Sequence, residues 1–173
     1  MARKVVMLRS AERSERPLGM PVGRPRGAKA QGVRYEKACS AAIPQAKPGQ
    51  WWHFIDANGP GYCQTDLVLI GRDSVLVLEC KYTWTMNAWE QLERLYLPVV
   101  EKALARPAYG VQLCKVLRPE AENVVYGLRE ALAGAMLGRR IAIHWSGTGP
   151  LGTRVRDDWA AGPAGLAGAP SAP

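Results

Sequence analysis

Two short apolar segments separated by a turn constrain the fold of this chain more than any other feature. Thr65 to Ile70 has the sequence TDLVLI, Ser74 to Tyr82 has the sequence SVLVLECKY, and residues 71–73 between them are Gly-Arg-Asp. Runs of β-branched and aliphatic residues bounded by turn-forming residues predict two antiparallel strands joined as a hairpin. In such a hairpin the start of the first strand lies beside the end of the second, so residues at those two places are expected to meet.

Charged side chains occupy both of those places. Asp66 stands at the start of the first segment, and Glu79 and Lys81 stand near the end of the second. Successive side chains in a strand point to opposite faces, so Glu79 and Lys81 share a face while Cys80 points the other way. A charged group within an apolar strand costs free energy unless it is paired or used. Two explanations stay open, namely an ion pair at the edge of a sheet and a functional site.

The rest of the chain predicts alternating strands and helices in one domain. A length of 173 residues lies within the range of a single domain. Apolar periodicity ended by proline predicts helices, and short β-prone runs predict strands. The fold class expected is therefore α/β, in the order α-β-β-β-α-β-α-β. Helices are expected at Val33–Ile43, about Asn87–Ala105 (with Thr85 as its cap) and about Val124–Leu137, and further strands at Gln50–Asp56, Val111–Leu117 and Arg140–Trp145.

The net charge of +8 is concentrated near the N-terminus. Residues 1–30 contain eight Lys and Arg against two Glu, together with three Pro, and are expected to form a flexible basic arm. A surplus of this kind suggests a polyanionic partner such as DNA, with Arg24, Arg26 and Lys29 as contacts to its backbone. Residues 31–157 are expected to fold as the domain, and the Ala-, Gly- and Pro-rich residues 158–173 to form a tail.

The sequence also limits where the protein is expected to work. No segment approaches the roughly 18 consecutive apolar residues of a membrane span, and the first residues contain too short an apolar run for a secretory signal. Cys39, Cys63, Cys80 and Cys114 are scattered without a C-x-x-C pair, so neither a zinc ribbon nor a disulfide framework is expected. These features predict a cytoplasmic protein with reduced thiols, in a bacterium or a phage-infected host.

The charged residues of the hairpin suggest metal-assisted chemistry on a phosphate. The carboxylate oxygens of Asp66 and Glu79 suit Mg²⁺ or Mn²⁺, which keep open positions for water and phosphate. Such an ion polarises a phosphate and lowers the pKa of a bound water. Lys81 would orient or deprotonate that water, or offset the charge that develops on the phosphorus.

Two ordered motifs resemble those of a known superfamily. Asp66, twelve intervening residues and the ECK triplet Glu79–Lys81 resemble the signature of the PD-(D/E)XK nucleases, although Thr65 stands where the signature has proline. Gln91–Tyr96, with the sequence QLERLY, is similar to the Q-h-x-x-h-Y motif of the RecB-like clade. The resemblance implies a restriction-endonuclease-like αβββαβ core, with a central mixed β-sheet flanked by helices.

The resemblance also suggests roles for other residues. Gln91 would position the water, a carboxylate or the phosphate. Glu36 would supply a further acid and metal ligand from the first helix, with an ion pair on the helix surface as the alternative. Tyr96 lies about 140° further round an α-helix than Gln91, so the two are not expected to share a contact point. For Tyr96, packing is preferred to a DNA contact, whereas Trp84 is the best candidate for stacking on an unpaired base.

The cysteines do not match a cluster-binding pattern. Some RecB-like nucleases hold an iron-sulfur cluster with one cysteine upstream of the motifs and three downstream. Here only Cys114 follows the motifs, so no cluster is expected.

The function that these observations predict is that of a Mg²⁺- or Mn²⁺-dependent deoxyribonuclease. Exonuclease action is somewhat preferred to endonuclease action, in DNA repair, recombination or phage DNA processing, as a homo-oligomer or within a larger complex. Two alternatives stay open. One is a non-catalytic DNA-binding or assembly subunit with the same fold, and the other is a dimeric junction-resolving or restriction-type endonuclease.

Overall fold

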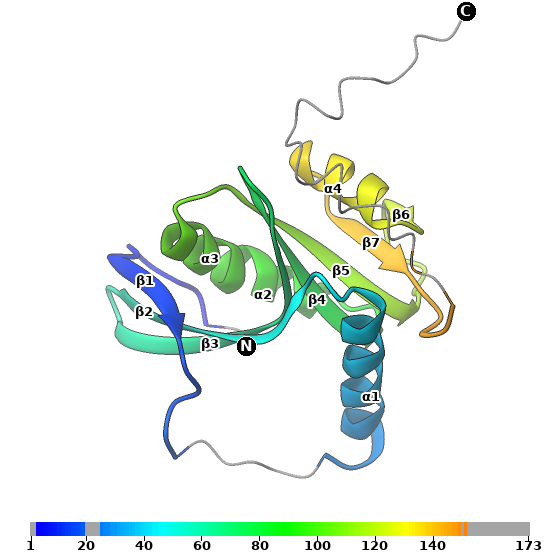
Figure 1. Ribbon diagram of the computed structural model, residues 1–173, viewed down its shortest axis with the longest axis horizontal. Coiled ribbons are helices and arrows are strands. Elements are labelled where there is room, and N and C mark those ends of the chain that lie inside the picture. The colour runs from blue at the N-terminus through cyan, green and yellow to red at the C-terminus, as the bar shows by residue number, and fades with distance from the viewer. Residues whose placement is uncertain (1–2, 20–24, 150, 152–173) are drawn as a thin grey trace, which may run out of the picture.

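A computed structural model of the chain describes residues 3–19, 25–149 and 151 and has an α/β fold (Figure 1). A seven-stranded mixed sheet forms its centre, in the order β1-β2-β3-β4-β5-β7-β6. The predicted fold class is confirmed at this level. The elements are β1 (Ser10–Ser14), α1 (Gly27–Ala42), β2 (Lys47–Asp56), β3 (Gly59–Ile70), β4 (Val75–Thr83), α2 (Met86–Gln91), the π-helical turn η1 (Leu92–Tyr96), α3 (Leu97–Leu104), β5 (Ala108–Val116), β6 (Val124–Val125), α4 (Leu128–Met136) and β7 (Ile141–His144).

The sheet has an antiparallel half and a parallel half that meet at β4. Strands β1 to β4 pair antiparallel, whereas β5 pairs parallel with both β4 and β7. The predicted hairpin is confirmed: Leu67 pairs with Leu78 and Ile70 pairs with Val75 across β3 and β4. This register sets Asp66, one residue before Leu67, opposite Glu79.

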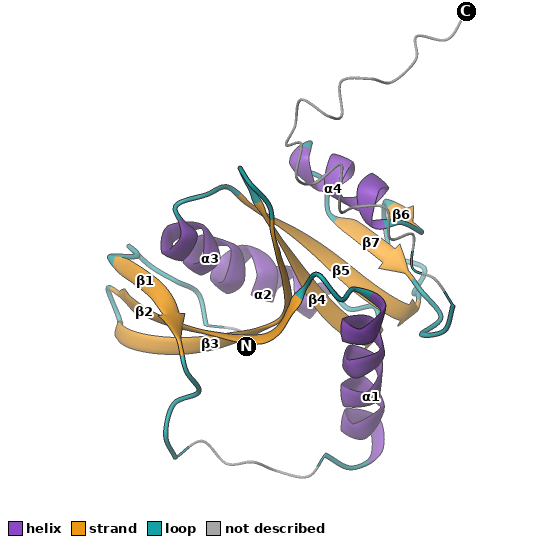
Figure 2. Cartoon of the chain, viewed as in Figure 1, coloured by secondary structure: helices purple, strands orange, loops and turns teal. Residues whose placement is uncertain are grey.

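Helices cover both faces of the sheet (Figure 2). On one face α1 and α4 pack against the odd-numbered side chains of β3 and the even-numbered side chains of β4, including Leu67 and Leu78. On the other face the α2–η1–α3 segment packs against alternate side chains such as Val68 and Val77. Because strand side chains alternate, Asp66, Glu79 and Lys81 belong to this second face.

The basic N-terminal segment departs from the expected flexible arm. Ser10–Ser14 forms the edge strand β1, and the amide of Val5 donates to the carbonyl of Arg94 at 3.0 Å. Arg3 forms an ion pair of 2.7 Å with the buried Asp56 carboxylate. The sequence of β1 is polar and shows no clear hydrophobic alternation, so it gave no signal of a strand. The segment becomes a strand because it pairs with the edge of β2. The expectation of an arm over residues 1–30 is thus corrected where the segment is described.

The first helix begins earlier than the sequence predicts, and some predicted segments lie outside the described residues. Helix α1 begins at Gly27, six residues before the predicted start, so Arg26 and Lys29 belong to its N-terminal end. Arg24 and the predicted tail at residues 158–173 lie outside the described residues.

The long helix predicted for residues 87–105 is divided into three segments. The cap is confirmed, because the Thr85 hydroxyl accepts a hydrogen bond from the Asn87 amide at 3.3 Å. A π-helical turn follows α2, and α3 ends at Ala105, which has a left-handed φ of 50°. Further along, the predicted helix at residues 124–137 begins only at Leu128, since Val124 and Val125 form the short strand β6.

No helix in the described part of the chain is long and apolar enough to cross a membrane.

Two helical glycines give opposite tests of this packing. An alanine methyl group at Gly134 in α4 would lie 2.5 Å from Ile141 Cδ1, whereas at Gly32 in α1 it would meet no atom within 4 Å. Gly134→Ala is therefore expected to lower the free energy of unfolding by about 1–3 kcal/mol through overpacking. Gly32→Ala is expected to raise it by about 0.5–1 kcal/mol, because alanine loses less backbone entropy in a helix.

Urea denaturation at neutral pH measures both glycine variants. Equal effects of Gly32→Ala and Gly134→Ala would contradict the described packing of α4 on β7.

Candidate active site

The centre of the candidate site is the contact between strands β3 and β4. Asp66 lies opposite Glu79, and its Oδ2 accepts a hydrogen bond of 2.8 Å from the backbone amide of Cys80. This bond ties the Asp66 carboxylate to the neighbouring strand. The structure therefore brings together the two carboxylates that the hairpin predicted.

Lys81 connects the buried carboxylates with solvent. Its Nζ lies 2.5 Å from Glu79 Oε1, and the side chain is 34% exposed, whereas the Glu79 side chain is 1% exposed. Glu79 Oε2 has no hydrogen-bond partner among the described residues. One oxygen of Glu79 is thus paired with an ammonium group, and the other is buried and unsatisfied.

Glu36 approaches the same group of charges from α1. Burial and the nearby Asp66 carboxylate raise the pKa of Glu36, and Lys81 opposes that rise more strongly than the neighbouring Lys37 does. The charges of Asp66 and Lys81 therefore reach the predicted further acid, although α1 packs on the opposite face of the sheet.

The acidic groups hold protons more tightly than exposed carboxyls do. Burial and the Asp66 charge raise the pKa of Glu79 to about 7, against the partial opposition of Lys81. Burial likewise raises the pKa of Asp66, although Lys81 and the Cys80 amide lower it. For Lys81, burial lowers the pKa, but attraction to Glu79 and Asp66 outweighs this and raises it. Lys81 is therefore a cation at neutral pH, while the Glu79 carboxyl is poised near its titration point.

The π-helical turn joins Gln91 and Tyr96 above this site. The Leu97 amide donates to the Leu92 carbonyl, a bond spanning five residues, and the Gln91 Nε2 donates to the Tyr96 hydroxyl. In a π-helix residues five apart lie on one face, so the expectation that the two share no contact point is wrong. Tyr96 is 5% exposed, which agrees with packing rather than a DNA contact. Burial and then the Glu79 and Asp66 charges raise its pKa, so the neutral phenol lies near the acids.

Gln112 is a further polar residue of the site that the sequence analysis missed. It lies on β5 in register with Glu79 and is completely buried. Neither its Nε2 nor its Oε1 has a hydrogen-bond partner in the described part of the chain. A single amide within the apolar run Val111–Leu117 was the available signal. Asp66, Glu79 and Gln112 thus form a polar row across three adjacent strands.

The other predicted contacts lie elsewhere. Trp84 is 5% exposed and packs in the core beside α2, although it also lines a hollow with Thr83 and Arg118. Arg26 and Lys29 are exposed at the start of α1. All four cysteines are buried free thiols.

The donor atoms suit a hard divalent cation rather than a closed metal centre. Within residues 3–19, 25–149 and 151, no group of three or more His, Cys, Asp or Glu side chains is arranged to hold a metal. Mg²⁺ commonly takes one or two protein carboxylates and completes its shell with water and substrate phosphate. Asp66 and Glu79 fit that requirement, because one Glu79 oxygen is buried without a partner among the described residues and the Asp66 charge raises the pKa of Glu79.

Replacement of Glu79 tests the electrostatics of the site. A carboxyl whose pKa is raised to about 7 in the folded state binds its proton more tightly there than when unfolded. This tighter proton binding stabilises the folded state fully below pH 4.5, and the stabilisation is lost as the pH rises through 7. In metal-free buffer the free energy of unfolding of wild type is expected to fall between pH 5 and pH 8. In Glu79→Gln this fall should be smaller by about 2 kcal/mol, because the titrating carboxyl is gone.

The measurement is urea denaturation at both pH values, with Glu101→Gln as the control because Glu101 is exposed on α3. The same pH dependence in Glu79→Gln and wild type would show that Glu79 is not a buried, proton-binding carboxyl.

Replacement of Gln112 tests whether its amide is unsatisfied. Gln112→Met keeps a similar volume and removes two buried polar atoms, each of which costs about 1–3 kcal/mol when it lacks a partner. The free energy of unfolding is expected to rise by about 1 kcal/mol, whereas the exposed Gln45→Met should change it by less than about 0.5 kcal/mol. A fall of 1 kcal/mol or more in Gln112→Met would show that the amide is satisfied in solution.

Comparisons of the chain with protein-family models, with curated proteins and with solved structures find no match. The arrangement of Asp66, Glu79 and Lys81 within the fold therefore carries the functional argument.

Proposed function

We propose that this protein is a metal-dependent DNA nuclease that hydrolyses phosphodiester bonds. The observation that carries the proposal is the convergence of Asp66, Glu79 and Lys81 on one face of the β3–β4 hairpin, near Gln91 at the end of α2 and Tyr96 of the π-helical turn. The order of α1, β2, β3, β4, the α2–α3 segment and β5 supports assignment to the αβββαβ core of the PD-(D/E)XK nucleases.

Asp66 and Glu79 would hold Mg²⁺ or Mn²⁺. Glu36 would act as a further acid, because it lies near enough for the Asp66 and Lys81 charges to shift its pKa. When bound, the ion would polarise the scissile phosphate and lower the pKa of an attacking water. The buried site would strengthen these electrostatic effects, since charges interact more strongly away from bulk water.

Lys81 has the role of a positive charge in this proposal. The ammonium group is held by Glu79 at 2.5 Å, and the raised pKa of Lys81 keeps it protonated at neutral pH. It would therefore offset the charge that develops on the phosphate rather than remove a proton from water.

Gln91 and Tyr96 would position the reacting groups. Their side chains hydrogen-bond one another, which limits the freedom of the Gln91 amide at the edge of the site. Tyr96 stays neutral near the acids, so it adds no further negative charge against an approaching phosphate. Both residues act in this proposal by orientation, for which small displacements carry a large cost in rate.

The unsatisfied polar groups favour this function over a purely structural ion pair. A structural pair would be most stable with every buried oxygen and amide paired, yet among the residues that the structure describes Glu79 Oε2 and both polar atoms of Gln112 lack partners. Buried polar groups that lower stability are characteristic of sites kept for chemistry.

The test is digestion of end-labelled linear, nicked, circular and single-stranded DNA side by side, with Mg²⁺ or Mn²⁺ and with chelator. Wild type is expected to cut at least one substrate only in the presence of the metal. Asp66→Asn and Lys81→Ala are each expected to lower the rate by about 100-fold or more, since each removes a charge that acts on the reacting phosphate.

Matched substitutions at the other end of the hairpin and on α3 serve as controls. Asp73→Asn and Lys102→Ala change exposed residues and should leave the rate within about twofold of wild type. Wild type that cuts the other substrates but leaves circular DNA intact would indicate exonuclease action. Wild type that binds DNA but leaves all four substrates intact with either metal would overturn the proposal in favour of a non-catalytic DNA-binding subunit.

A further inference from the structure

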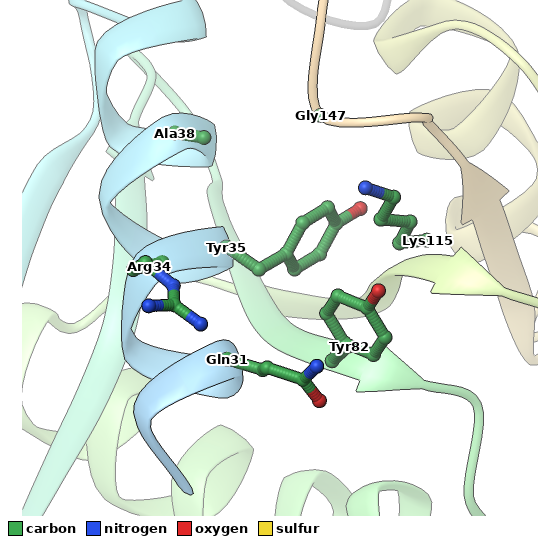
Figure 3. Close-up of a pocket in the computed structure, with 7 residues that line it drawn as sticks. All are labelled: Gln31, Arg34, Tyr35, Ala38, Tyr82, Lys115 and Gly147. Atoms are coloured by element: carbon green, nitrogen blue, oxygen red, sulfur yellow. The ribbon is translucent and has the colours of Figure 1, made fainter. Parts of the chain in front are cut away.

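A second hollow opens on the opposite face of the sheet, between α1, the ends of β4 and β5, and the loop after β7. Its volume is about 290 Å³, at the low end of the range for small-molecule sites. Figure 3 shows Tyr35, Tyr82 and Lys115 grouped around this space, with Gln31 reaching from α1 toward Tyr82. The hollow has room for one small group and not for a duplex.

The charge of the hollow is positive. Arg34 of α1 and Lys115 of β5 line it, and none of the described lining residues is acidic. Lys115 Nζ lies 5.5 Å from the centre of the Tyr82 ring, so the cation rests over the aromatic face. Two cations without a carboxylate partner in the lining favour an anionic ligand.

The aromatic wall of the hollow is rigid. The Tyr35 hydroxyl donates to the Trp145 carbonyl at 3.0 Å, and the Tyr35 ring meets Tyr82 edge to face at 6.2 Å. Gly147, with a left-handed φ of 91°, lies beside Tyr35, because a methyl group added at this glycine would be 3.6 Å from the Tyr35 ring. Tyr82 is half-buried, so part of its ring remains available to a flat ligand.

The hollow and the candidate active site share two elements. Tyr82 follows Lys81 on β4, and Tyr35 precedes Glu36 on α1. Side chains of neighbouring strand residues point to opposite faces, so the two sites lie on either side of the same strand end. A flexible chain that passes around the end of β4 reaches both, whereas a stiff duplex does not follow so sharp a path.

We propose that this hollow binds one unpaired nucleotide of a DNA strand, with Tyr82 against the base and with Arg34 and Lys115 each on one of the two phosphates that flank it. The inference rests on the proposed nuclease function and deepens it, because it makes single-stranded DNA or a frayed end the substrate. Gln31 offers the amide donor and acceptor that a base edge requires. An aromatic ring beside a cationic groove is the arrangement by which proteins hold unpaired bases without reading sequence.

The test is the binding of a fluorescein-labelled 12-nucleotide DNA strand, and of the duplex of the same length, followed by fluorescence anisotropy in chelator. Arg34→Gln with Lys115→Gln is expected to weaken single-strand binding by about tenfold. The slope of log affinity against log salt should shrink by about 1.4, because two phosphate contacts are lost. Tyr82→Leu is expected to weaken the same binding by about tenfold without changing the salt slope.

Controls separate this pocket from general charge and from the active site. Arg72→Gln with Lys102→Gln removes two exposed cations away from the hollow and should leave the single-strand affinity unchanged. If Tyr82→Leu fails to fold, Tyr82→Trp is used instead and should preserve single-strand binding. Duplex affinity should respond to Tyr82→Leu by less than about twofold.

Each outcome decides the proposal. Unchanged single-strand binding in the Arg34 and Lys115 variant overturns it, and so does an equal loss of duplex and single-strand binding without an effect of Tyr82→Leu. Because binding is measured without metal, a protein that cuts no DNA but shows the expected losses retains the pocket and loses only the nuclease proposal. A protein that cuts single strands normally after all three pocket substitutions retains the nuclease proposal and loses the pocket.

Discussion

The register of β3 on β4 is the constraint on which the rest of the site depends. Leu67 opposite Leu78 sets Asp66 opposite Glu79, and the bond from the Cys80 amide holds the Asp66 carboxylate at that place. Shifting the register by one residue would turn the side chains of one strand to the opposite face of the sheet. Apolar packing on both faces of β4 therefore fixes the register, and the register fixes the carboxylates.

The fold keeps Asp66 and Glu79 buried although burial is unfavourable for a charged carboxylate. Burial disfavours the charged forms of Asp66 and Glu79, while the Lys81 charge favours both and the Cys80 amide favours that of Asp66. Gln112 adds an amide without a partner in the next strand. Polar groups in this state are stabilising only when a further ligand or proton satisfies them, so the stability of the sheet and the chemistry of the site oppose one another.

The sequence contained the hairpin, the Thr85 cap and the pairing of Asp66 with Glu79, because each depends on residues close together or on strand alternation. It did not contain the contact between Gln91 and Tyr96, since helical periodicity assumes 3.6 residues per turn and a π-helical turn breaks that rule. It missed β1 for another reason: a polar edge strand is ordered by the neighbour it joins, not by its own pattern. Gln112 was visible as a single amide in an apolar strand, but its place beside Glu79 required the parallel register of β5.

The alternation of β4 finally relates the two faces to one another. Glu79 and Lys81 point to the acidic site, whereas Tyr82 points to the hollow lined by Arg34 and Lys115. Three carboxyls around one lysine repel a phosphate until a cation or protons reduce their charge, so the site alone is a poor initial binding surface. A cationic hollow one residue further along the same strand supplies attraction without adding positive charge to the acids themselves. In the proposed nuclease, binding and cleavage would be divided between the two faces of a single strand, whose alternation keeps the two sites close in space but electrostatically distinct.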